Sequence, residues 1–211
     1  MRWDGDGPGY GSPIVAEFDG TRQIITLTQD NMVGVAASTG TLLWKRRFET
    51  NYTQNCITPL LYGQTIVVSG LDKGVTAFKV VKTDGQWTTT NVWENTDVSM
   101  YMTNGVIVRD TLVALSHKNS GQFFGLDLKT GKTVWTSGPR QGTNAAIVRA
   151  GELLFVLKDD AELLVTRSGP NGFEIARTYT VADSATWAEP VVSGNRVFVK
   201  DVATLALWTV N

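Results

Sequence analysis

The fold of this 211-residue chain is decided by the stretch Leu126-Asp127-Leu128-Lys129-Thr130-Gly131-Lys132-Thr133-Val134-Trp135. A similar stretch runs from Val35 to Trp44, and both contain Thr-Gly followed by a tryptophan at the same distance. More diverged copies place a turn before Trp93 and Tyr179. These four aromatic positions recur at intervals of about 40–50 residues, which is the length of a four-stranded propeller blade.

Two further sequence features recur at the same interval as the aromatic residues. Each repeat opens with a short polar or proline-containing segment, as at Ser12-Pro13 and Thr58-Pro59, and a β-rich run follows. A tight turn rich in Asp, Asn and Gly comes next, because such turns need positive φ or side-chain hydrogen bonds to the backbone. No window shows the apolar periodicity of a long helix. The sequence therefore predicts an all-β fold of four-stranded antiparallel blades.

The blades are expected in one propeller segment over residues 1–211, as an incomplete arc of four to five blades. Their approximate ranges are 11–49, 56–94, 100–137, 143–180 and an incomplete 187–211. Trp3 matches the end of a blade that would precede this chain, and Thr204 to Val210 match the last strand of the unfinished one. The alternative is a ring of four to five blades closed by residues 1–10.

The pattern Leu-Asp-x-x-Thr-Gly-x-x-x-Trp, nearly complete from Leu126 to Trp135, resembles the pyrroloquinoline-quinone-like repeat. That repeat builds the quinoprotein alcohol dehydrogenases and a propeller lipoprotein of the bacterial outer-membrane assembly machinery. The resemblance covers nearly the whole chain and implies a bacterial β-propeller in a periplasmic or secreted setting. It is specific for the fold and leaves the activity open.

Composition excludes several kinds of partner. The formal net charge is −1, with 19 basic and 20 acidic residues mixed along the chain. This balance gives no electrostatic footprint for nucleic acid, so no nucleic-acid partner is expected. No run of apolar residues is long enough to span a membrane, and no targeting signal is recognisable.

The resemblance implies a quinone site only if its ligands are present. Quinoprotein dehydrogenases hold the quinone between a tryptophan and a disulfide of adjacent cysteines, with a calcium ion beside it. This sequence has one cysteine, Cys56, and Glu189 is the only carboxylate at the start of an inner strand. The single histidine, His117, lies in a predicted turn and no Gly-x-Ser-x-Gly motif accompanies it. We therefore expect no cofactor, no metal site and no catalytic residue in this chain.

Three residues remain as candidates for ligand contact at the mouth of the propeller channel: Trp187, Glu189 and Tyr101. They precede or begin predicted inner strands. The leading functional prediction is a non-enzymatic scaffold that recognises a protein or a peptide and also contacts the missing blades of a parent propeller. The alternative is part of a quinoprotein dehydrogenase or a propeller hydrolase whose catalytic residues lie outside this chain.

Overall fold

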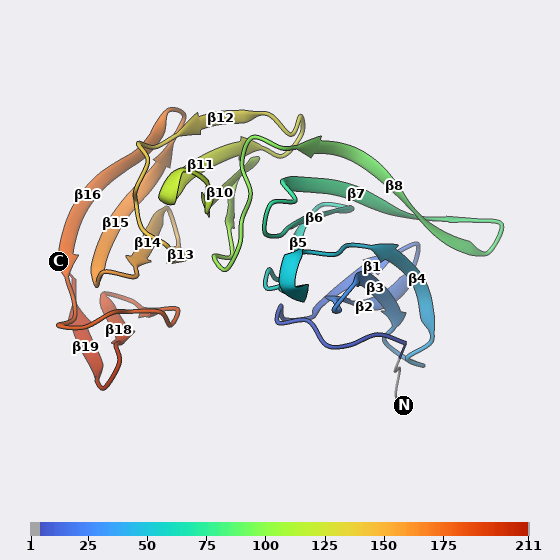
Figure 1. Cartoon of the computed structure of the whole chain (residues 1–211), viewed down its shortest axis with the longest axis horizontal. Coiled ribbons are helices and arrows are strands. Elements are labelled where there is room, and N and C mark those ends of the chain that lie inside the picture. The colour runs from blue at the N-terminus through green and yellow to red at the C-terminus, as the bar shows by residue number, and fades with distance from the viewer. Residues whose placement is uncertain (1–4, 211) are drawn as a thin grey trace. The chain divides into compact units, whose positions relative to one another are not determined.

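The computed structural model describes residues 5–210 and is built from antiparallel β-sheets (Figure 1). Its strands are β1 (Ile14–Phe18), β2 (Thr21–Leu27), β3 (Asn31–Ala36), β4 (Leu42–Arg47), β5 (Leu60–Tyr62), β6 (Thr65–Ser69), β7 (Val75–Thr83), β8 (Gln86–Asn95), β9 (Val106–Val108), β10 (Thr111–Ser116), β11 (Gln122–Asp127), β12 (Thr133–Thr136), β13 (Ala145–Ala150), β14 (Leu153–Lys158), β15 (Glu162–Gly169), β16 (Gly172–Thr180), β17 (Val191–Ser193), β18 (Arg196–Lys200) and β19 (Leu205–Thr209). The helical segments of the described residues are the 3-10 turns η1 (Asn51–Thr53) and η2 (Lys118–Ser120).

The strands form four four-stranded sheets, namely β1–β4, β5–β8, β9–β12 and β13–β16, and one three-stranded sheet, β17–β19. Neighbours in every sheet follow each other in sequence, as propeller blades require. The predicted fold class, an all-β propeller of four-stranded antiparallel blades, is therefore confirmed. No helix among residues 5–210 is long and apolar enough to cross a membrane.

The chain divides into two compact units, residues 1–102 with β1–β8 and residues 103–211 with β9–β19. The prediction that residues 1–211 form one propeller segment stays a prediction. The match of Trp3 to the end of a preceding blade lies outside the described residues.

The Thr-Gly turn of the repeat has the same backbone hydrogen bond and the same glycine conformation in two sheets. The carboxylate of Asp127 accepts hydrogen bonds from the backbone N–H groups of Lys129 (2.9 Å) and Thr130 (2.7 Å). Gly131 then takes φ +72°, and its N–H donates to the carbonyl of Asp127 at 2.8 Å. Gly40 repeats this conformation in the first sheet at φ +69°. Glycine is needed here because other residues adopt positive φ at a cost.

The tryptophan that ends the motif packs over a glycine of the neighbouring strand. Trp135 pairs with Gly125 at a β-bulge, and a Cβ atom added to Gly125 would lie 2.2 Å from the indole nitrogen. Trp44 pairs with Gly34 in the same way, at the same distance. Both indoles are buried, with exposed fractions of 7% and 4%. The glycine therefore makes the space that the indole fills.

The other two complete sheets depart from this pairing. Trp93 lies opposite Ala77 and is only half-buried. In the fourth sheet the residue at the equivalent bulge is Arg177, opposite Val165. The prediction that Tyr179 is the fourth recurring aromatic position, equivalent to Trp44, Trp93 and Trp135, was therefore wrong by two residues. Tyr179 instead pairs with Leu163 and packs against the apolar cluster between β13–β16 and β17–β19.

Apolar side chains fill the space between successive sheets inside each unit. In the first unit a cluster joins β1–β4 to β5–β8. In the second unit one cluster joins β9–β12 to β13–β16, and another joins β13–β16 to β17–β19. Each fully buried large side chain contributes about 1.5–3 kcal/mol. Representative members of the three clusters are Ile25, Leu27 and Phe78; Val113, Phe123 and Leu154; and Phe155, Leu163 and Val197.

Candidate functional site

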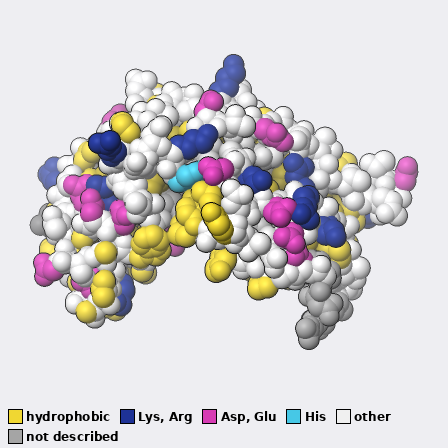
Figure 2. Space-filling view, viewed as in Figure 1, with side chains coloured by type: hydrophobic (Ala, Val, Ile, Leu, Met, Phe, Trp, Pro, Cys, Tyr) yellow, Lys and Arg dark blue, Asp and Glu magenta, His cyan; other side chains and the backbone are white. Residues whose placement is uncertain are grey.

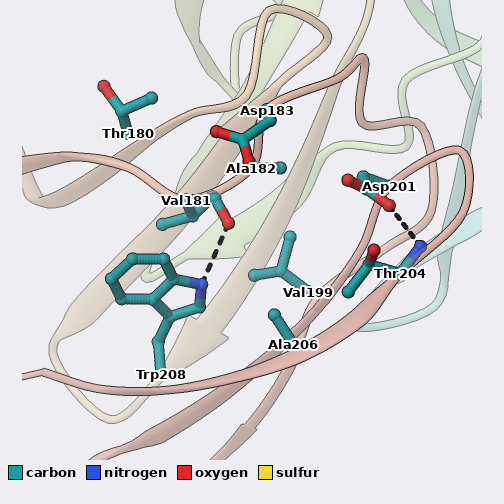
Figure 3. Close-up of a pocket in the computed structure, with 9 residues that line it drawn as sticks. All are labelled: Thr180, Val181, Ala182, Asp183, Val199, Asp201, Thr204, Ala206 and Trp208. Carbon is teal, nitrogen blue, oxygen red and sulfur yellow. Dashed lines mark hydrogen bonds between the residues drawn. The ribbon is translucent and has the colours of Figure 1, made fainter.

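A pocket of about 330 Å³ lies in the second unit, where the end of β16 passes the strands β18 and β19 (Figure 3). It is open to solvent, and three separate segments of the chain contribute to it. Its lining residues are Thr180, Val181, Ala182, Asp183, Val199, Asp201, Thr204, Ala206 and Trp208.

The floor of the pocket is apolar and fixed in position. Val181 and Val199 are buried members of the core between β13–β16 and β17–β19. The indole N–H of Trp208 donates a 2.9 Å hydrogen bond to the carbonyl of Val181 (Figure 3). This bond orients the ring, whose side chain remains 38% exposed. An oriented and partly exposed indole is a good surface for an apolar ligand group.

The rim of the pocket is polar, and the carboxylate of Asp201 on this rim already accepts hydrogen bonds from backbone N–H groups. Asp201 accepts hydrogen bonds from the N–H groups of Thr204 (2.5 Å) and Ala203 (3.0 Å). The bond from Thr204, against a small opposing effect of burial, lowers the pKa of Asp201 below its ordinary value. Asp201 therefore remains charged and holds the turn before β19. The pocket thus combines an apolar floor with a charged rim, an arrangement suited to binding.

The strand β19 borders this pocket and forms an edge. Within residues 5–210, β18 is the only strand that pairs with β19. Val210 donates its N–H to Asn195 (2.9 Å), and the carbonyl of Thr204 accepts from Asp201 (3.0 Å). Because hydrogen bonding alternates along an antiparallel strand, the N–H groups of the odd-numbered residues point away from β18. These are Leu205, Leu207 and Thr209.

The first predicted site residue, Tyr101, lies in the first unit in the connection after β8. It is half-buried, and its hydroxyl donates a hydrogen bond to the side-chain carbonyl of Gln54. Burial is the main cause that raises the pKa of Tyr101, and the neighbouring Cys56 and Tyr10 add to it. The phenol thus bridges two connections between sheets.

The other two predicted site residues, Trp187 and Glu189, lie in the second unit between β16 and β17. Both are exposed, and Trp187 shows 59% of its surface. Thr186 anchors the segment, because its hydroxyl donates to the carbonyl of Lys158 at 2.5 Å. Tyr101 belongs to the other compact unit, so no common site is defined for all three. Their role in ligand contact stays a prediction.

The described residues do not fit the quinone and calcium site that the fold family implies. The sequence holds one cysteine, Cys56, and burial raises the pKa of its thiol. No group of three or more His, Cys, Asp or Glu side chains gathers among the residues that the structure describes. The disulfide of adjacent cysteines that borders the quinone in such a site has no counterpart in this sequence.

The sequence matches the family model described as outer membrane protein assembly factor BamB over residues 3–208. The chain therefore belongs to this family of propellers with pyrroloquinoline-quinone-like repeats. No curated protein matches it in sequence.

Solved structures agree on the fold. BamB from Moraxella catarrhalis superposes with a TM-score of 0.65 at 16% identity, over 97% of this chain and 59% of that one. A quinohemoprotein alcohol dehydrogenase from Pseudomonas putida HK5 gives a TM-score of 0.59 at 15% identity, over 99% of this chain and 43% of the other. This chain therefore spans about three fifths or less of the length of these proteins. At such identities the likeness concerns the fold alone.

Proposed function

We propose that this chain is a non-enzymatic recognition module that binds an extended segment of another protein at the edge of β19. The observation that carries the proposal is the position of the pocket beside this edge. An added strand gains main-chain hydrogen bonds from the edge, while pockets for alternate side chains give specificity. Here the edge offers donors and the neighbouring pocket offers an apolar floor.

The expected ligand follows from the alternation along β19. Ala206 and Trp208 line the pocket, whereas the backbone N–H groups that face the edge belong to odd-numbered residues. A strand bound antiparallel to β19 would use those groups and direct every second side chain toward the pocket. An aromatic or branched aliphatic side chain suits the space next to Trp208. The ligand class is thus an extended peptide with alternating apolar residues.

The family to which the chain belongs also supports a protein as the ligand. Its description names an assembly factor for outer membrane proteins, so a protein client in a periplasmic or secreted setting is consistent with it. Further blades of a parent propeller, which the repeat resemblance predicts, are a second partner that we propose for this surface.

A displayed library of ten-residue peptides is the probe for this proposal. We expect selection on the purified chain to enrich peptides with alternating apolar residues. Ala206→Arg places a long side chain in the pocket and should weaken the binding of a selected peptide at least tenfold. Ala203→Arg is the matched control, because Ala203 is exposed and does not line the pocket.

A second variant tests the backbone part of the interaction. Thr209→Pro removes an N–H group that faces the open edge and leaves the bonds to β18 in place. Peptide affinity should fall while the melting temperature stays nearly unchanged. The proposal fails if no alternating peptide is selected, or if affinity is insensitive to both Ala206→Arg and Thr209→Pro.

A further inference from the structure

The sheet β17–β19 has a second surface, on the face that points away from β13–β16. Val191, Phe198 and Leu207 lie directly opposite one another across its three strands. Val191 is 60% exposed, Leu207 is 53% exposed and Phe198 is half-buried. We call these three residues the outer row. Hydrophobic side chains reach the surface where β18 and β19 lie, at the lower left of Figure 2.

The preceding sheet, β13–β16, contains an equivalent row of three residues that is covered by the next sheet. Val148, Phe155 and Val165 lie opposite one another in β13–β16. Phe155 and Val165 belong to the buried cluster that includes Val197 and Val199 of the next sheet, and Val148 packs against that cluster. The same three-residue arrangement therefore forms a contact between successive sheets.

The first sheet carries the matching half of such a contact. Val15, Ile24 and Val35 lie opposite one another across β1, β2 and β3, and we call them the entry row. Val15 is 56% exposed, and the other two are half-buried. In the second sheet, Ile66 and Phe78 are opposite each other and pack on the sheet before them. Each unit thus presents one face of the kind that is buried between sheets inside the chain.

We propose that the outer row of one copy packs on the entry row of a second copy. The occupant is a second copy because the two rows repeat, on different faces, the contact that already joins successive sheets. Two different patches meet, so the contact is head-to-tail. Burial of the exposed valine and leucine side chains drives the association. The proposal is independent of peptide recognition, because the outer row and the pocket lie on opposite faces of β17–β19.

Two lysine substitutions separate the halves of the contact. Leu207→Lys alters the outer row and Val15→Lys alters the entry row, and both positions are already exposed enough to accept the charge. We expect the wild-type chain to show a concentration-dependent mass of at least two copies in light scattering. Each variant alone should be monomeric, while Val134→Lys, at a residue that is 49% exposed, should associate like wild type.

An equimolar mixture of the two variants gives the decisive result. Each variant keeps one intact row, so the mixture should form a dimer through a single contact and grow no further. The proposal is overturned by a monomeric wild-type chain, by association that survives either substitution, or by a mixture that stays monomeric although both variants are folded by circular dichroism.

Discussion

The indole N–H of Trp44 donates a 2.7 Å hydrogen bond to the side-chain carbonyl of Gln23, and the equivalent bond is missing at Trp135. The indole nitrogen of Trp135 is buried and has no partner among residues 5–210. Strand register explains the difference. Gln23 lies opposite Ala36, and Thr111 lies opposite Asp127. Ala36 and Asp127 are each two residues after the glycine that lies under the indole. Thr111 therefore occupies the place of Gln23, with a side chain too short to reach the ring.

Thr111→Gln should supply the missing acceptor and raise the free energy of unfolding by about 1 kcal/mol. Position 111 is half-buried, so the new amide nitrogen can reach water, unlike the buried and unpaired amide nitrogen of Gln23. Denaturant titration measures the effect. The control Gln23→Ala should lower the free energy by about 1–3 kcal/mol, because it leaves the Trp44 indole without an acceptor. A Thr111→Gln variant less stable than wild type would contradict this account.

Gly125→Ala should destabilise the chain by about 1–3 kcal/mol, because the added methyl group would overlap the Trp135 indole. The matched control is Gly138→Ala, where the nearest atom to an added Cβ is the side-chain nitrogen of Gln141 at 3.9 Å. Thermal melts of both variants test the difference. Equal melting temperatures would show that the ring moves aside without cost.

Asp127→Asn should remove part of the acid dependence of stability. Although burial opposes the effect, hydrogen bonds from Thr130 and Lys129 lower the pKa of Asp127 below its ordinary value of 3.8. The stability that the carboxylate contributes is therefore present above the ordinary pKa and is lost as the pH falls through the lowered value of the folded state. The loss should be about 1 kcal/mol or less, because the group is near solvent.

Unfolding titrations between about pH 5 and pH 2 check this prediction. The stability advantage of wild type over Asp127→Asn should shrink as the pH falls. An advantage that is constant over this range would show that the carboxylate does not titrate differently in the folded and unfolded chains.

Much of the fold was predictable because the repeat carries local rules. The Thr-Gly turn at Gly131 requires positive φ, and the motif therefore marks the same hairpin wherever it is intact. The prediction for Tyr179 was wrong because the bulge between Val165 and Thr166 leaves no mark in the sequence. This bulge brings Arg177 to the position that tryptophan occupies in the first and third sheets. Bulges depend on strand register, and register is set by pairing across the sheet.

The pocket beside β19 could not be predicted from the sequence. Trp208 was visible only as an aromatic residue in a terminal strand. Its role depends on the carbonyl of Val181 and on the side chain of Val199, which reach the pocket from two other segments. Tyr101, Trp187 and Glu189 lie before or at the start of predicted inner strands, which places them in connections between sheets. The position of a residue in a connection carries no information on pockets that form between strands.

The glycine under each buried indole also constrains the order in which these blades can change during evolution. The four complete sheets pair Gly with Trp twice, Ala with a half-buried Trp once, and Val with Arg once. An intermediate sequence with a side chain larger than alanine opposite an intact indole would be unstable. The tryptophan therefore has to be lost before the glycine is replaced by valine. Blade duplications of this type should therefore retain an orphaned glycine far more often than an orphaned tryptophan.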